Sequence, residues 1–216
     1  MKKLLQNFHQ NVYPKFFKNY FYELEKAVKD SKSLIDIGCG TDSPIKYFSK
    51  KIHAVGIDAF LPSIEKSKKQ NIHDEYYQIG VLDIDKHFED KSFDCALASD
   101  LIEHLTKEDG LKLIELMEKV ASKRVIIFTP NGFLQQGEYD NNPWQVHLSG
   151  WSVEEMQERG YKVIGINGWK PLRGEYSNIR YSPKSFWMFI SDITQFFVRN
   201  NPKKAFQIMC IKEFNN

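Results

Sequence analysis

The chain has few cysteines and no long apolar run. Its three cysteines, Cys39, Cys95 and Cys210, stand far apart, without the paired spacing of a zinc site or a disulfide framework. We therefore expect reduced thiols and a cytoplasmic location. No apolar stretch approaches the roughly 20 residues of a membrane-spanning helix. Polar residues directly follow the apolar start at 1–5, so we expect no signal peptide.

Neither sign of charge dominates. The net charge is +2, made up of +3 over residues 1–30, −5 over 31–150 and +4 over 151–216. The sequence lacks the interleaved basic and aromatic residues that are typical of RNA binders, so we expect no nucleic-acid partner. At 216 residues and 42% hydrophobic, the chain is long enough for one domain with a sizeable core.

A third glycine is lacking from the segment around which the chain is organised. Residues 33–44 read as a buried strand, a tight turn at Gly38 and Gly40, and a helix start with Ser43 as N-cap. A dinucleotide fingerprint, Gly-x-Gly-x-x-Gly, would have its third glycine where Ser43 stands, and Asp42 lies near the position that the pyrophosphate would take. A carboxylate there favours a cationic ligand over a phosphate.

The same turn resembles the first motif of the class I S-adenosylmethionine-dependent methyltransferases, which reads acidic-x-Gly-x-Gly. Asp36 supplies the acidic residue, and Cys39 lies between Gly38 and Gly40. The resemblance implies S-adenosyl-L-methionine as cofactor, held by these residues. It also implies methyl transfer to an oxygen, nitrogen or carbon of a small-molecule acceptor.

A second predicted strand, from His53, ends in Asp58, 18 residues after the second glycine of the turn. An acidic side chain at the tip of the second strand of a βαβ unit reaches the ribose hydroxyls. The alternative is a surface Asp that caps the helix beginning at Pro62. Ala59 and Phe60 follow, where an apolar side chain can cover the adenine.

Further cofactor contacts are implied after the third and fourth strands. The third strand is expected from Tyr76 to Leu82, and Asp83 after it would meet the adenine amino group unless it lies in a solvated loop. The fourth strand ends at Ser99 and Asp100. The carboxyl ends of central strands border the ligand crevice of open α/β sheets.

Two histidines are the candidate catalytic residues. His104 follows Glu103 in the string Ser-Asp-Leu-Ile-Glu-His-Leu, which resembles the post-strand motif of the small-molecule branch of these enzymes. His147 stands in the long loop 131–150 after the fifth strand, with Trp144 as a residue that could stack on a ring. Either histidine could take a proton from an acceptor hydroxyl, or could instead bond the backbone. No pattern requires a metal, and we expect none.

The resemblance implies an α/β fold of three layers, Rossmann-like, with a seven-stranded, mainly parallel sheet whose last strand is antiparallel. We expect one domain, 1–216, with an N-terminal helical cap at 1–30, a core at 31–168 and 206–213, and a helical insertion at 169–205. An apolar stripe in the insertion is expected to pack on the core. Residues 183–199 could instead form a lid or a peripheral membrane contact, and the chain could be a monomer or a homodimer.

Two other classes of function stay open at the level of sequence. An NAD-dependent oxidoreductase would use the same turn and Asp58, but would need a pyrophosphate beside Asp42. A non-catalytic methyltransferase-like interaction module would keep the fold without turnover. Such a module need not retain the acidic and glycine residues of the cofactor site.

Overall fold

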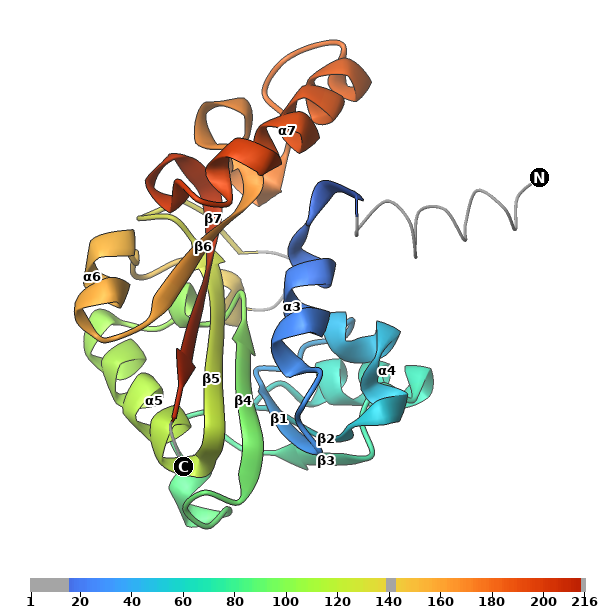
Figure 1. Cartoon of the computed structure of the whole chain (residues 1–216). Helices are drawn as coiled ribbons and strands as arrows, with labels where there is room; N and C mark the ends of the chain where they lie inside the picture. The colour runs from blue at the N-terminus through green and yellow to red at the C-terminus, as the bar shows by residue number, and fades with distance from the viewer. Residues whose placement is uncertain (1–15, 139–142, 215–216) are drawn as a thin grey trace.

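The computed structural model describes residues 16–138 and 143–214, which form a twisted sheet with helices on both faces (Figure 1). The strands are β1 (Ser33–Ile37), β2 (His53–Asp58), β3 (Glu75–Gln78), β4 (Phe93–Ser99), β5 (Ala121–Pro130), β6 (Lys162–Trp169) and β7 (Ala205–Glu213). The helices are α3 (Tyr20–Val28), α4 (Leu61–Gln70), α5 (Lys107–Val120), α6 (Val153–Glu158) and α7 (Lys184–Val198).

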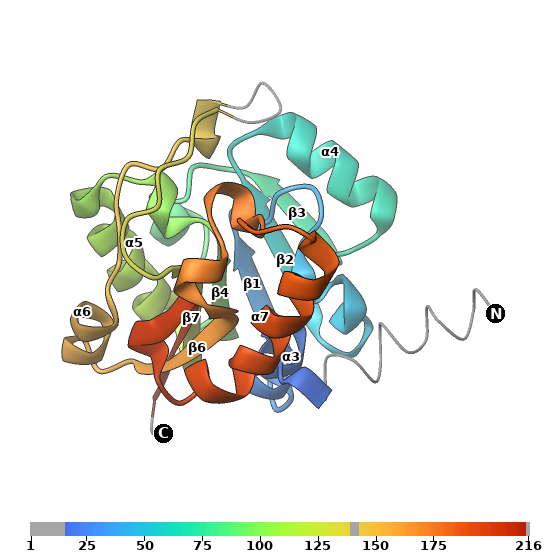
Figure 2. The same cartoon turned by 90° about the horizontal axis from the view of Figure 1, so that it is seen from above.

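The sheet order is β3-β2-β1-β4-β5-β7-β6. All neighbouring strands are parallel except that β7 runs antiparallel to both β5 and β6. Seen from above, helices lie on either side of the sheet and α7 lies over its edge (Figure 2). The predicted three-layer fold, with an antiparallel last strand between the fifth and sixth, is therefore confirmed.

Two apolar clusters fill the space between the layers. Neighbouring residues of β1 alternate between them, with Ile35 in the cluster against α5 and Leu34 in the cluster against α3. Both side chains are at most 1% exposed. A parallel sheet covered on both faces buries its central strands in this way, which explains the almost continuous apolar run in β1.

The segment after the glycine turn differs from the prediction. The sequence predicted a helix start after Ser43, but residues 44–51 contain two 3₁₀ turns, Pro44–Tyr47 and Ser49–Lys51. Phe48 separates the two turns because its φ of −142° is not helical. Ser43 caps the first turn as predicted, since its Oγ accepts a hydrogen bond from the Ile45 N–H.

The third strand is also shorter than predicted. β3 ends at Gln78 rather than at Leu82, and the chain then turns, with the Asp83 N–H donating to the Gly80 carbonyl at 3.0 Å. The expected strand is cut short because residues 80–83 form a turn. Asp83 therefore follows a turn instead of closing a strand.

The predicted N-terminal helical cap and the predicted helical insertion can each be compared with the structure. α3 begins after its N-cap Asn19, and the earlier part of the expected helical cap, with Pro14, lies outside the described residues. α7 follows Pro183 as predicted. The expected packing of its apolar stripe on the core is wrong, because Phe186 and Phe189 are each 54% exposed. Among the residues described, no helix has the length and apolarity needed to cross a membrane.

Candidate functional site

The glycine turn after β1 is fixed by its backbone and by one close neighbour. Gly38 and Gly40 have φ angles of +66° and +59°, a region that side chains rarely adopt. A Cβ on Gly38 would lie 2.6 Å from Leu101 Cδ1, so the Leu101 side chain would have to shift to admit it. Between them, the Cys39 N–H donates to the Ile57 carbonyl at 3.0 Å. The turn is thus anchored to β2.

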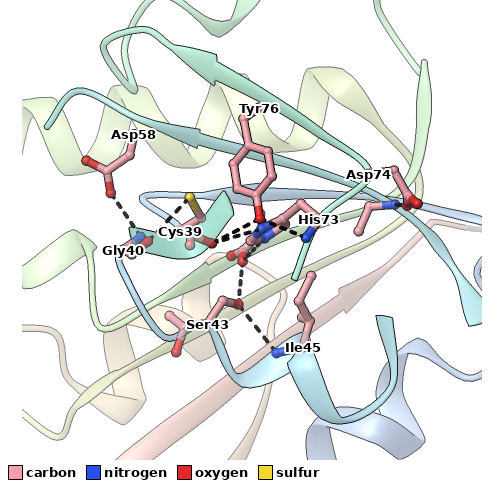
Figure 3. A network of polar contacts seen from close by, with 12 residues as sticks. Cys39, Gly40, Ser43, Ile45, Asp58, His73, Asp74 and Tyr76 are labelled. Carbon is pink, nitrogen blue, oxygen red and sulfur yellow. Dashed lines mark hydrogen bonds and ion pairs between the residues drawn. The ribbon is translucent and has the colours of Figure 1, made fainter. Parts of the chain in front are cut away.

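Asp36 lies beneath the turn and is 1% exposed. Its Oδ2 accepts a hydrogen bond from Ser43 Oγ at 2.5 Å and lies 2.8 Å from His73 Nε2. Tyr76 holds His73 in place, since the His73 N–H donates to the Tyr76 hydroxyl at 3.1 Å (Figure 3). These bonds direct the carboxylate into the domain. Asp36 therefore supports the turn from below, and its contact with a cationic group of the cofactor stays a prediction.

Asp58 lies beside the turn at the end of β2, as predicted. Its Oδ2 accepts from the Gly40 N–H at 2.9 Å and its Oδ1 from the Phe60 N–H at 2.8 Å (Figure 3). Burial raises the pKa of the Asp58 carboxyl, and the two backbone bonds oppose that shift. Each oxygen keeps a further acceptor site, so ribose hydroxyls can still donate to it. Ala59 is exposed and Phe60 half-buried beside it.

The two residues predicted after the third strand have different surroundings. Leu82 packs, partly buried, against the core. Asp83 lies at the surface, where Lys86 Nζ donates to its Oδ1 at 2.5 Å, and this bond lowers the pKa of the Asp83 carboxyl. The contact of Asp83 with the adenine amino group stays a prediction.

Ser99 and Asp100 end β4 at the same edge of the sheet. Ser99 Oγ lies 2.7 Å from the hydroxyl of Tyr20 on α3. Asp100 has a φ of +49°, and its Oδ1 accepts from Gln207 Nε2 at 2.8 Å. Although solvent reaches Asp100 through the open cleft, the surrounding protein raises the pKa of its carboxyl to about 7 by desolvation. Tyr20 stacks on Phe128 of β5, with ring centroids 4.0 Å apart, so α3 covers this part of the cleft.

A cavity of about 550 Å³ opens above these residues. Its wall includes Tyr20, Asp100 and both candidate histidines, and also Tyr176 and Ser177 from the insertion. The cavity therefore joins the predicted cofactor edge of the sheet to the loop after β5. It is the space in which a methyl donor and an acceptor could meet.

Three side chains of metal-ligand type meet in this cavity. One ligand atom each from Glu103, His104 and His147 lie within 4.8 Å of one another. Thr129 Oγ1 donates to Glu103 Oε2 at 2.9 Å. Burial, with the charge of Asp100 second, raises the pKa of the Glu103 carboxyl well above its usual value. Burial lowers the pKa of both imidazoles, that of His104 to about 4, so both are neutral at pH 7.

Backbone carbonyls orient the two imidazoles. His104 Nδ1 lies 3.2 Å from the Val146 carbonyl oxygen, and His147 Nδ1 lies 2.6 Å from that of Leu134. A neutral imidazole that donates from Nδ1 keeps a lone pair on Nε2, which is the usual arrangement of a metal-binding histidine. With bonds of about 2.1 Å, a cation holds its ligands about 3 to 4.2 Å apart. Ligand atoms 4.8 Å apart would have to approach one another by about 0.6 to 1.8 Å to bind one ion.

Some residues of the site were missed by sequence reasoning. Tyr20 and Gln207 contact Ser99 and Asp100 from elements distant in the sequence, and no local signal marks either residue. The sequence does contain a signal for the metal-type cluster, namely the adjacent pair Glu103 and His104 and the later His147. Trp144, the predicted stacking residue, is 61% exposed and lines a second hollow of about 280 Å³, of which His104 is also a wall. Asn141 and Asn142 of the same loop lie outside the described residues.

A glycine turn after β1, a carboxylate at the end of β2 and a cavity at the carboxyl edge of the sheet are the arrangement expected of the cofactor site in a class I methyltransferase fold. Residues 35–129 match the family described as methyltransferase domain. The chain therefore contains an S-adenosylmethionine-dependent methyltransferase domain. This favours the methyltransferase interpretation over the oxidoreductase alternative.

Individual relatives agree on the class. The chain is 27% identical over 176 residues to a small RNA 2′-O-methyltransferase of Tetrahymena thermophila, a match that covers 63% of this chain and 40% of the relative. It is 26% identical over 134 residues to the chloroplastic tocopherol O-methyltransferase of Arabidopsis thaliana, covering 57% and 38%. The matches thus span less than half the length of these relatives.

A solved S-adenosylmethionine-dependent methyltransferase from Archaeoglobus fulgidus shares the fold. Its TM-score is 0.57 at 14% identity, and the match covers 94% of this chain and 98% of that protein. At this identity the likeness concerns the fold alone.

Proposed function

We propose that the protein transfers the methyl group of S-adenosylmethionine to a hydroxyl oxygen of its acceptor, assisted by a divalent cation. The observation that carries this proposal is the meeting of Glu103, His104 and His147 in the cavity that also contains Asp100. The names of both curated relatives specify methylation on oxygen, which supports the choice of atom.

A hydroxyl is a weak nucleophile until its proton is removed. Methyl transfer itself relies on in-line positioning at about 3 Å, which a shaped cavity supplies. A bound divalent cation would lower the pKa of the hydroxyl and orient its oxygen toward the methyl group. Glu103, His104 and His147 would hold the cation, and Thr129 would fix the Glu103 carboxylate through its hydrogen bond. Two imidazoles and a carboxylate suit a transition-metal ion such as Mn²⁺ or Zn²⁺.

The same geometry also serves a metal-free mechanism, in which a histidine takes the proton directly. His147 is the first candidate and His104 the second, because each keeps a free Nε2 lone pair when Nδ1 donates to a carbonyl. A positioned general base contributes about 10²- to 10⁴-fold to the rate. Metal binding distinguishes the two mechanisms.

We infer that the acceptor is a small molecule whose hydroxyl enters the cavity, with Trp144 and the hollow beside His104 receiving an attached ring. An RNA hydroxyl is the second candidate, favoured by the similarity to the Tetrahymena enzyme. Labelled S-adenosylmethionine, offered with a panel of hydroxylated small molecules and with a short RNA, discriminates between them. Label in the RNA alone would contradict the small-molecule assignment. The free, buried thiols support the proposal of a reducing, cytoplasmic location.

The metal is tested by titrating chelator-treated protein with Mn²⁺ and with Zn²⁺ in a calorimeter. We expect one site, lost in Glu103→Gln and in His147→Ala. His53→Ala is the matched control, since His53 is exposed and pairs with Glu75 at 3.1 Å on another part of the surface. Absence of binding to the folded wild-type protein would refute the metal and leave the general-base mechanism. In that case His147→Ala should lower the turnover rate at least about tenfold with unchanged cofactor affinity.

A further inference from the structure

α7 lies on the molecule with its polar side inward. Its buried residues are Ser191, Gln195 and Val198. Gln195 Nε2 donates to the Gly165 carbonyl at 2.9 Å, and its Oε1 accepts from the Gly168 N–H at 3.1 Å. These bonds connect α7 to β6. The helix is therefore attached to the domain through polar contacts. An ordinary surface helix instead packs its apolar stripe against the core.

Two glycines of β6 fix the rotation of α7 about its own axis. A Cβ on Gly165 would lie 2.1 Å from the Val198 carbonyl oxygen, and one on Gly168 would lie 2.3 Å from the Ser191 carbonyl oxygen. The helix backbone therefore rests directly on the strand. A helix held this closely cannot turn its other side inward without losing these contacts.

The opposite side of α7 is an exposed apolar face. At about 100° per residue, five of its side chains fall within an arc of roughly 100°. This α7 face consists of Phe186, Phe189, Ile193, Phe196 and Phe197, each 45% to 54% exposed. The edge of the Phe16 ring meets Phe196 at a centroid distance of 6.0 Å, and Phe16, 64% exposed, extends the face toward α3. Contiguous apolar faces of this kind mark interaction sites.

Basic residues lie at both ends of the α7 face. Residues 169–204 contain seven Lys and Arg against two Asp and Glu, but Arg199 pairs with Glu23 and Lys203 with Glu154, both outside this segment. Lys204 Nζ lies 5.3 Å from the centroid of the Phe197 ring. Arg180 and Lys184 are exposed, and no described acidic residue forms an ion pair with either. Charge and apolarity thus coincide on one side of the molecule.

We propose that the α7 face binds the surface of an anionic phospholipid bilayer. Aromatic and apolar side chains that enter the headgroup region, flanked by lysines and arginines, are the features of helices that lie in a membrane interface. A second copy of the chain is a poor occupant, because symmetric pairing would bring the exposed Arg180, Lys184 and Lys204 of two copies together. Tyr176 and Ser177 of the same insertion line the catalytic cavity, so a bound membrane would lie near its mouth. The proposal does not depend on the acceptor or on the metal.

Vesicle sedimentation tests the proposal without any methyl transfer. Vesicles of phosphatidylcholine with about one quarter phosphatidylglycerol should bind the full chain, and binding should weaken as the salt concentration rises. The double variant Phe189→Ser, Ile193→Ser should lower the affinity at least about tenfold. Because both side chains are exposed, the variant should fold normally, which circular dichroism checks. Phe133→Ser is the matched control, since Phe133 is 61% exposed outside the α7 face.

Several results would overturn the membrane assignment. The folded wild-type chain could fail to bind these vesicles, or the double variant could bind as well as the wild type. An equal loss of vesicle binding in Phe133→Ser would show that binding does not depend on the α7 face. A concentration-dependent dimer that Phe189→Ser abolishes would show that a second copy covers the face. Binding to a short RNA that Phe189→Ser abolishes, without vesicle binding, would identify a nucleic-acid surface.

Discussion

Replacing His73 by alanine should lower the free energy of unfolding more than a histidine-to-alanine substitution at the surface. The His73 ring and the Asp36 carboxylate are almost fully buried, with side chains 0% and 2% exposed, and are separated by 2.8 Å. Removing one partner of such a buried pair costs about 3 to 5 kcal/mol, because the other group remains in the interior without compensation. Ser43 is left as the remaining side-chain partner of Asp36, and its hydroxyl carries no charge.

The free energy of unfolding, measured by urea titration with circular dichroism, checks this magnitude. His53→Ala is the control, because its half-exposed ring also pairs with carboxylates and should cost less than about 1 kcal/mol. Asp36→Asn in the His73→Ala background should recover part of the loss, since it removes the uncompensated charge. A loss below about 1 kcal/mol in His73→Ala, equal to that of the control, would refute the claim that this pair supports the turn.

Three further predictions concern the cofactor site, the insertion and the thiols. Asp58→Ala should weaken S-adenosylmethionine binding by about 1.5 to 3 kcal/mol in calorimetry, and unchanged affinity in the folded variant would remove its ribose role. Gly168→Ala should lower the free energy of unfolding by about 2 to 4 kcal/mol, because φ is +73° and the new Cβ meets the Ser191 carbonyl. Gly137→Ala, with no atom within 4 Å of its Cβ, should leave stability nearly unchanged. Burial raises the pKa of all three thiols, that of Cys95 to about 12, so a thiol reagent at pH 8 should label none of them before urea unfolds the chain. Rapid labelling of the native protein would contradict their burial.

The local sequence was sufficient to predict the turn and the sheet. A run of buried apolar residues, two glycines and the acidic residue at the end of β2 are all read within a single βαβ unit, and the structure confirms their arrangement at one edge of the sheet. Capping signals were equally dependable. Thr106 with Asp109 and Ser152 with Glu155 have the three-residue spacing of a capping box, and Thr106 and Ser152 cap α5 and α6.

Contacts between distant segments could not be predicted in this way. His73, from the segment before β3, lies 2.8 Å from Asp36 in the folded chain, and no spacing in the sequence predicts this contact. Glu103 and His104 were noted together, but their approach to His147 depends on the path of the loop after β5. No spacing rule gives the path of a long loop.

The insertion shows most clearly which features the sequence determines and which depend on the tertiary structure. By itself the sequence determined that α7 is an amphipathic helix, because its apolar residues recur at helical spacing. Periodicity gives the width of a stripe and says nothing about which side of the helix meets the protein. The tertiary structure decided that, through Gly165 and Gly168, whose missing side chains let the polar side of α7 approach β6. The apolar side therefore faces outward, since a helix attached to a strand on one side can bury only that side.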